Sequence, residues 1–189
     1  MAKKIFIGIK QIWYADPITT ALTATRLKSL LSSANAHEVL NSHSDTWGYE
    51  ESDPEKTEYL NELTGQNYYV DVTKGSIPTV SFTMGEYDYV EKADLQGGMA
   101  ITANGSKASD ASTAVGWRKT NDLSVIEKAI IARTKSNKFI VLTRAAVTAK
   151  GNFVEKNLGL GVTAMALENG EVGSEYWFDG EAVNGSSED

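Results

Sequence analysis

The chain has 189 residues, a formal net charge of −7 and no cysteine. This length is enough to bury a hydrophobic core, and we expect one domain over residues 1–189. The absence of cysteine excludes disulfides and thiolate metal sites. Residues 157–189 contain seven acidic residues and no basic one, so the whole negative excess lies there. Such a charge disfavours a groove that binds nucleic acid, but it is compatible with a passage through which DNA slides without sticking.

The first part of the chain predicts a strand over residues 3–14, a helix over 24–33 and a further strand over 37–43. Leucines recur at helical spacing after Thr23, which is a typical N-cap residue. The only histidines, His37 and His43, would lie about 20 Å apart on an extended strand, too far to share a metal ion. No apolar run approaches transmembrane length, so no membrane association is expected.

Residues 44–65 form a long polar segment, with six acidic residues between positions 50 and 62. It also carries three aromatic residues, Trp47, Tyr49 and Tyr59. The segment is too long for an ordinary connection, which indicates a functional loop. We expect it to dock on another surface through these aromatic side chains; the alternative is a solvated arm.

The next two segments, residues 66–73 and 78–89, predict two strands joined as a hairpin through residues 74–76. On the second strand Val80, Phe82 and Met84 alternate with small polar residues. A sheet with this pattern is covered on one side only. Small hydroxyl groups and an acid, in place of Lys and Glu, favour a face that is wet but confined, such as a lumen or a cleft. The predicted lumen-facing residues are Asp71, Thr73, Thr79, Ser81 and Thr83.

The remainder of the chain predicts a loop followed by strands rich in β-branched and apolar residues. The loop covers residues 97–116; the strands lie within 124–134, 138–150, 158–168 and 174–178. A tight turn is expected at residues 136–138, and a frayed acidic tail at about 180–189. The fold class that follows is a mainly antiparallel β-sandwich or barrel with one or two short helices.

No pattern in the sequence predicts catalysis, a cofactor or a metal site. The run Gly159–Ala164 matches G-x-G-x-x-A, but a polar loop precedes it and no long helix follows, as dinucleotide binding would require. We interpret its glycines as sites where strands or subunits approach closely. An enzyme with an acid pair such as Glu86 and Asp88 is the weakest alternative.

Four stretches resemble the major tail tube proteins of phages and prophages. They are HSDTWGYEESDPEKTEYLNELTGQNYYVD, PTVSFTMGEYDYVEKADLQGG, GWRKTN and KAIIARTKSNKFIVLTRAAVTAKGNFVEKNLGLGVTAMALENG. The last is the most telling: a hairpin of apolar strands leads through a short polar link into GLGVTAMALE. Together the stretches cover about residues 37–170.

The resemblance implies a β-sandwich or barrel subunit, flanked by a helix, that forms hexameric rings stacking into a hollow tube. Strands of neighbouring copies would join edge to edge around a lumen through which DNA passes without specific binding. The segment 44–65, with Trp47, Tyr49 and Tyr59, would reach the next ring or subunit. The partners implied are further copies and other tail proteins, in the virion tail after assembly in the host cytoplasm. The acidic region 157–189 is not assigned to the lumen.

A second function class is open to the same sequence. A soluble β-sandwich could recognise carbohydrate or protein through exposed tryptophans, namely Trp13, Trp47, Trp117 or Trp177. Stoichiometry separates the two hypotheses, since a binding module is monomeric and a tube subunit is not.

Overall fold

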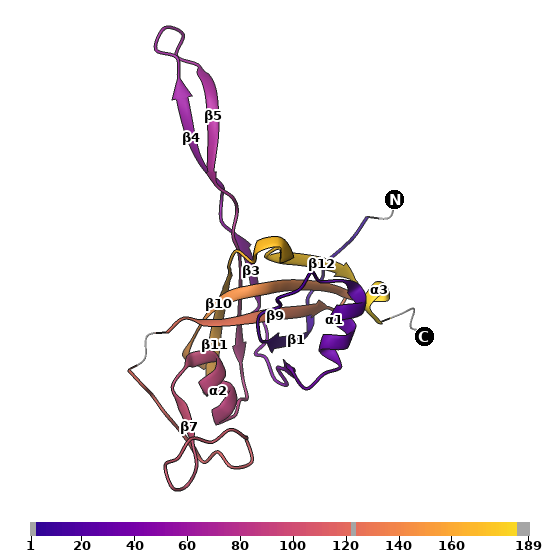
Figure 1. Ribbon diagram of the computed structural model, residues 1–189, viewed down its shortest axis with the longest axis vertical. Coiled ribbons are helices and arrows are strands. Elements are labelled where there is room, and N and C mark those ends of the chain that lie inside the picture. Colours follow the sequence, from indigo (N-terminus) through magenta and orange to yellow (C-terminus); the bar gives the residue numbers. More distant parts are fainter. Residues whose placement is uncertain (1–2, 122–123, 185–189) are drawn as a thin grey trace.

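The computed structural model describes residues 3–121 and 124–184. It is mainly antiparallel β with three short α-helices in this described part, as the sequence predicts (Figure 1). The strands are β1 (Ile9–Ala15), β2 (Ala36–Glu38), β3 (Gly48–Glu51), β4 (Glu55–Leu60), β5 (Asn67–Lys74), β6 (Pro78–Met84), β7 (Met99–Ile101), β8 (Gly116–Arg118), β9 (Ile126–Thr134), β10 (Lys138–Val154), β11 (Asn157–Ala166) and β12 (Glu175–Asp179). The helices are α1 (Ala24–Leu31), α2 (Tyr89–Gln96), α3 (Gly180–Asn184) and the 3-10 turn η1 (Gly170–Val172).

One sheet, in the order β2-β1-β9-β10-β11-β6-β3, makes up the body of the molecule, and β12 pairs with β10 beside it. The 17-residue strand β10 belongs to two layers. Its first part pairs with β9 and β12, and its second part pairs with β11. The register with β9 shifts between Leu142 and Ala145, and such a bulge bends a strand. The sheet thus folds over itself into a sandwich.

Alternation along the strands builds two cores, one on each face of the first layer. Ile12, Tyr14 and Ile130 point between the two layers, where they meet Phe82 and the other apolar residues of β6 and β11. Their neighbours Trp13 and Ile131 point to the opposite face, which packs against residues of α1 and α3. The first layer is therefore covered on both faces.

Local signals explain the helices. Thr23 caps α1, accepting a hydrogen bond from the Arg26 amide at 3.3 Å, and the predicted helix over 24–33 is confirmed with slightly shorter bounds. Helix α2 starts with a capping box in which Asp88 and Glu91 bond each other's backbone amides. This arrangement satisfies amides that a helix otherwise leaves without partners.

The N-terminal strand is shorter than predicted. It begins at Ile9 rather than at residue 3, because Gly8 has a φ of +54° and interrupts the extended backbone. The turn predicted at residues 136–138 is confirmed, since Asn137 has a φ of +56° between β9 and β10.

Two predictions about the segment before β6 are wrong. Residues 44–65 are not a loop, because they contain β3 and β4. The predicted hairpin of residues 66–73 with 78–89 does not form, because β5 pairs with β4, whereas β6 lies between β3 and β11. Strand β6 also ends at Met84, and α2 follows it. The β4–β5 hairpin projects from the body as an arm (Figure 1).

The tail predicted at about residues 180–189 is wrong for its first half. Residues Gly180–Asn184 form α3, and Val183 is buried against α1 and β12 residues. The acidic composition of this segment suggests a frayed tail, but burial of the Val183 side chain holds α3 against the body. Residues 185–189 lie outside the described part of the chain.

Candidate functional site

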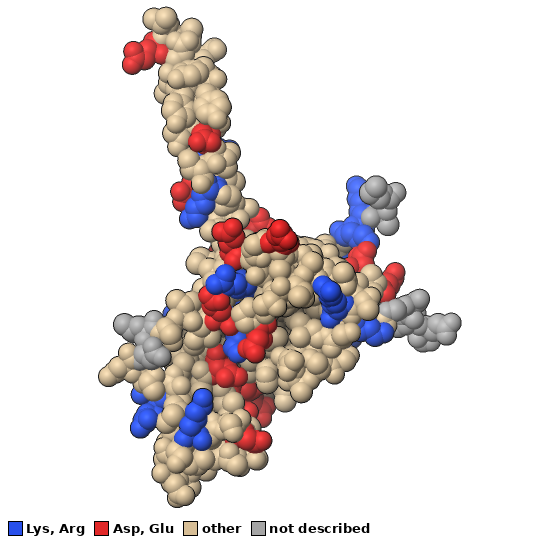
Figure 2. All heavy atoms as spheres, viewed as in Figure 1, with Lys and Arg blue, Asp and Glu red and all other residues tan. Residues whose placement is uncertain are grey.

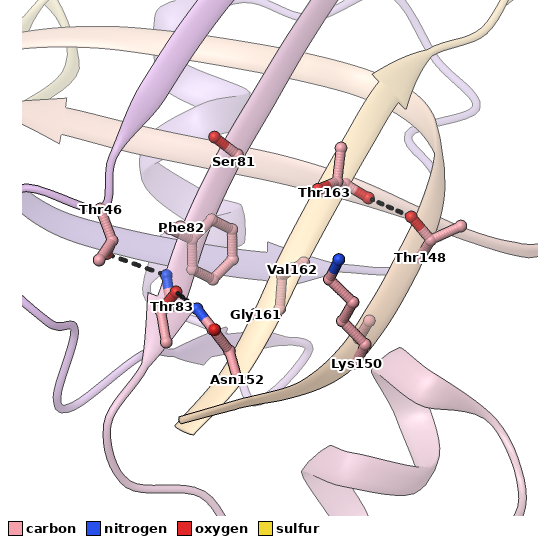
Figure 3. A pocket seen from close by; sticks show the side chains of 11 residues that line it. Thr46, Ser81, Phe82, Thr83, Thr148, Lys150, Asn152, Gly161, Val162 and Thr163 are labelled. Atoms are coloured by element: carbon pink, nitrogen blue, oxygen red, sulfur yellow. Dashed lines mark hydrogen bonds between the residues drawn. The ribbon is translucent and has the colours of Figure 1, made fainter. Parts of the chain in front are cut away.

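The second layer, formed by β3, β6, β11 and the second part of β10, has one face in the core and one outer face. Thr148, Thr163 and Ser81 lie side by side across the outer face as direct cross-strand partners. They line a shallow depression of about 440 Å³ (Figure 3). Thr148 and Thr163 are exposed and Ser81 is half-buried. The outer face is therefore a wet surface of small hydroxyl groups.

Glycines keep this face flat. A Cβ atom added at Gly159 would lie 2.8 Å from the carbonyl oxygen of Met84, and one added at Gly48 would lie 2.7 Å from Ser81 Oγ. Gly159–Ala164, the run that matches a dinucleotide fingerprint, lies entirely within β11 and leads into no helix. The interpretation of the glycines in this run as points of close strand approach is confirmed for Gly159, whereas a Cβ atom at Gly161 would come closest to the Asn152 side chain, at 3.2 Å.

Three of the five residues predicted to face a lumen lie on this outer face. Thr79 and Ser81 are half-buried, and Thr83 is buried. The backbone amide of Thr83 donates to Thr46 Oγ1 at 3.1 Å, and its hydroxyl accepts from Asn152 Nδ2 at 3.2 Å. Thr83 therefore fixes neighbouring elements to the face rather than presenting a free hydroxyl group.

The prediction that Asp71 and Thr73 lie on this face is wrong. Both belong to β5 and lie in the arm, so they share no sheet with β6. The residues that complete the face come instead from β10 and β11. The sequence contains a signal for two of them, since Thr163 lies between the buried Val162 and Ala164, and Thr148 follows the buried Val147.

The arm is the second notable feature. All residues of β4 and β5 are exposed. Tyr59 lies with its ring centre 5.6 Å from that of Tyr69 and 6.4 Å from that of Tyr68. At the arm's base the Ser52 amide donates to the Ile77 carbonyl at 3.1 Å, and the Ile77 amide donates to Ser52 Oγ at 2.9 Å. The arm thus leaves the body from a fixed point.

Of the three predicted docking aromatics, Tyr59 alone lies in the arm. Trp47 packs against the main core, stacked on Phe82 with ring centres 6.3 Å apart. Tyr49 is in β3, and its hydroxyl lies 2.6 Å from Glu51 Oε1 and 2.8 Å from Glu175 Oε1. Trp47 and Tyr49 therefore hold the base of the arm to the body.

At the base of the arm, the Tyr49 hydroxyl lies between the carboxylates of Glu51 and Glu175. Burial and hydrogen bonds to Glu51 and Glu175 raise the pKa of the Tyr49 hydroxyl, so it stays protonated and donates. Figure 2 shows acidic and basic side chains together on the lower arm and around its base, where Lys74 pairs with Glu55. The surface beside Tyr49 therefore combines an aromatic ring with the carboxylates of Glu51 and Glu175.

The histidines and one residue of the candidate acid pair have structural contacts in the described part of the chain. No group of three or more His, Asp or Glu side chains in residues 3–121 and 124–184 is arranged to hold a metal ion. His37 stacks on Tyr14, with ring centres 5.0 Å apart. Asp88, one member of the candidate acid pair, caps α2. None of the described helices is long and apolar enough to cross a bilayer.

Comparison with known proteins adds no family to this description. No protein-family model matches the sequence, and a search of curated proteins finds no match.

Proposed function

We propose that this protein is a structural subunit that assembles into stacked hexameric rings, forming the tail tube of a phage or prophage through which DNA is ejected. The observation that supports this most is the second layer of the sandwich: four antiparallel strands with one face in the core, a hydroxyl-rich outer face and free backbone edges on both sides. Such a layer is a segment of a barrel that further copies can complete.

The chemistry of the outer face suits a passage for DNA. Tight contact with DNA needs several Lys or Arg side chains on the phosphates. Lys150 is the one cation among the residues that line the depression, and the others are mostly hydroxyl-bearing or small. A duplex could therefore move along this face without being held.

The diameter of such a barrel is also large enough for double-stranded DNA to pass. Four strands from each of six copies make about 24 strands, spaced by about 4.8 Å and tilted by about 36°. This gives a backbone radius of about 23 Å and leaves an opening on the order of 35–40 Å between facing side chains. Double-stranded DNA fits through such an opening.

The arm provides the contact between rings. A two-stranded hairpin alone is marginally stable in water, and this one exposes Tyr68, Val70 and Val72 by 69%, 44% and 57%. Burial of these side chains on another copy would stabilise both the arm and the stack. Further copies and other tail proteins are thus the proposed partners, in the virion tail, with assembly in the host cytoplasm and no role for a cofactor or catalysis.

The alternative of a tryptophan-based binding module has less support. Trp13 is 7% exposed, Trp47 packs against the core, and the Trp117 indole donates to the Gly97 carbonyl at 2.8 Å. Trp177 is 43% exposed, but Phe6 and Tyr49 pack edge-on against its ring, with ring centres 4.6 Å and 5.6 Å away. None of the four tryptophans therefore offers a free ring on which a sugar could stack.

The proposal is tested by sedimentation velocity and hydrogen exchange over a series of concentrations. We expect particles of ring size or larger as concentration rises, and slower exchange of the amides in residues 55–74 in the assembled fraction. Monomers at millimolar concentration with unprotected arm amides would contradict the proposal.

A further inference from the structure

The two free edges of the second layer are the strands β3 and the end of β10. Strand β3 pairs only with β6. Strand β10 pairs with β9 as far as Val147, so residues 148–154 pair with β11 alone. No other backbone bond to residues 48–51 or 148–154 is present in the described part of the chain. Each edge therefore offers unpaired N–H and C=O groups.

The strand directions allow these edges to meet in a ring. All neighbours in the layer are antiparallel, and the layer has four strands, so β3 and β10 run in opposite directions. In a ring all copies point the same way along the axis. The β3 edge of one copy therefore meets the β10 edge of the next as an antiparallel pair, and the alternation continues around the ring.

The pleat restricts the register of this pair. Because side chains alternate between faces, residues on the outer face of one strand must pair with outer-face residues of the other. Gly48 is the partner of Ser81, so Gly48 and Glu50 are outer-face residues. Their counterparts on β10 are the even-numbered residues. If residues 48–51 lie wholly on the free segment, Gly48 pairs with Asn152 or, two residues further, with Val154.

Side-chain chemistry selects the first of these registers. With Gly48 opposite Asn152, Glu50 lies opposite Lys150, and Tyr49 lies opposite Gly151. Glu50 and Lys150 are exposed, and neither forms an ion pair within the described residues. Directly opposed opposite charges stabilise a strand pair, and a glycine opposite a large aromatic avoids crowding. In the second register Glu50 would face the neutral Asn152.

We propose that β3 of one copy pairs with residues 149–152 of β10 in the next copy, with Glu50 facing Lys150 across the contact. This register rests on the proposed ring assembly and specifies the residues that close the ring. The partner is a second copy of this chain.

The register also gives the stagger that a closed barrel requires. Within one copy Gly48, Ser81, Thr163 and Thr148 lie at one level. Pairing Gly48 with Asn152 of the next copy displaces the strands by four residues for every four strands, or one residue per strand. This ratio is that of an eight-stranded barrel with a shear of eight, whose strands tilt by about 36°. A level pairing would give no tilt.

Cysteine cross-linking tests the register directly, because the chain has no cysteine of its own. Under mild oxidation, a variant with Glu50→Cys and Lys150→Cys should give a covalent ladder that ends at the copy number of the ring. A mixture of the two single variants should give covalent dimers and nothing larger, since each copy then has one thiol. The matched controls are Glu50→Cys combined with Thr148→Cys or with Asn152→Cys.

Charge exchange supplies an independent readout. Glu50→Lys or Lys150→Glu should weaken ring formation by about 3- to 30-fold for each contact, and the two changes together should restore it. Cross-linking that is strongest in a control pair, with rings present, would overturn the register and leave the proposed function intact. Wild-type protein that forms no rings at all would overturn both, because the edges would then have no partner copy.

Discussion

Strands β5 and β6 are consecutive in the chain and both carry large apolar residues at every second position, yet the environments of these residues are opposite. In β6 the side chains of Val80 and Phe82 are each 1% exposed, whereas in β5 those of Val70 and Val72 are 44% and 57% exposed. The difference arises from what covers each face. The core of this chain covers β6, and nothing in the described chain covers β5. The uncovered apolar side chains of the arm are consistent with the contact between copies proposed above.

The largest expected effect comes from removal of the arm. Replacement of residues 54–75 by a short Gly-Ser turn should abolish stacking, while the body keeps its thermal unfolding temperature within a few degrees. The bonds between Ser52 and Ile77 close the body below the cut. Electron microscopy and thermal unfolding measure the two properties. Stacked tubes from the shortened chain would contradict the role given to the arm.

The next largest effect is expected from truncating a buried side chain of β6, in comparison with an exposed side chain of β5. Phe82→Ala should lower the free energy of unfolding by about 3–5 kcal/mol, because it leaves a cavity between the layers. Val70→Ala should change the stability of the monomer by less than about 0.5 kcal/mol, but it should weaken assembly. Urea denaturation of dilute, monomeric protein measures both. A large loss of monomer stability in Val70→Ala would show that the arm packs on its own body.

Substitution of two glycines, one in the body and one at the arm, should show the same difference in stability with a smaller magnitude. Gly159→Ala should destabilise the monomer by about 1–3 kcal/mol, because the new Cβ meets the Met84 carbonyl oxygen and Thr83 Cγ2 at 2.8 Å. Gly75→Ala, at the end of the arm strand, meets no atom within 4 Å and should be close to neutral. If thermal unfolding shows equal losses for both, the close packing of β11 on β6 is not what requires Gly159.

The smallest expected effect is electrostatic. Asp179 pairs with Lys138 at 2.7 Å and with Lys4, and these contacts hold the pKa of its carboxyl below the usual value. A lowered pKa stabilises the folded state above the ordinary Asp pKa of about 3.9, and this contribution is lost as pH falls through the folded-state pKa.

Asp179→Asn should therefore lower the unfolding temperature by at most a few degrees near pH 7, and the difference should disappear as the pH falls below about 4. The control is Glu55→Gln, which breaks the Lys74 ion pair in the arm and should leave unfolding of the body unchanged. A difference between Asp179→Asn and wild type that persists at low pH would indicate lost packing rather than a lost charge.

Patterns within single strands predicted much of this fold. Alternation located β9, β10 and β11 and placed Val80, Phe82 and Met84 in the core, and Thr23 marked the start of α1. The small hydroxyl residues of β6 also indicated a wet, uncovered face. These features depend on neighbours within a few residues of the chain, which a sequence displays directly.

Patterns within single strands did not predict which strands pair with each other. Residues 74–76 look like a hairpin turn, but the turn that pairs β4 with β5 lies at Asn61–Gln66, where Gly65 has a φ of +68°. The charged residues of β4 hid a strand, because every residue of β4 and β5 is exposed and no core imposes an apolar alternation on β4. Likewise, composition gave no sign that Val183 is buried or that Trp47 packs on Phe82, because both depend on contacts between distant segments.

Negative-stain electron microscopy of the concentrated wild-type protein tests most directly whether copies of this chain close into hollow rings, as we propose. We predict rings in end view and tubes in side view, with a stain-filled lumen on the order of 35–40 Å wide. Isolated particles of monomer size, or solid filaments with no lumen, would contradict this proposal.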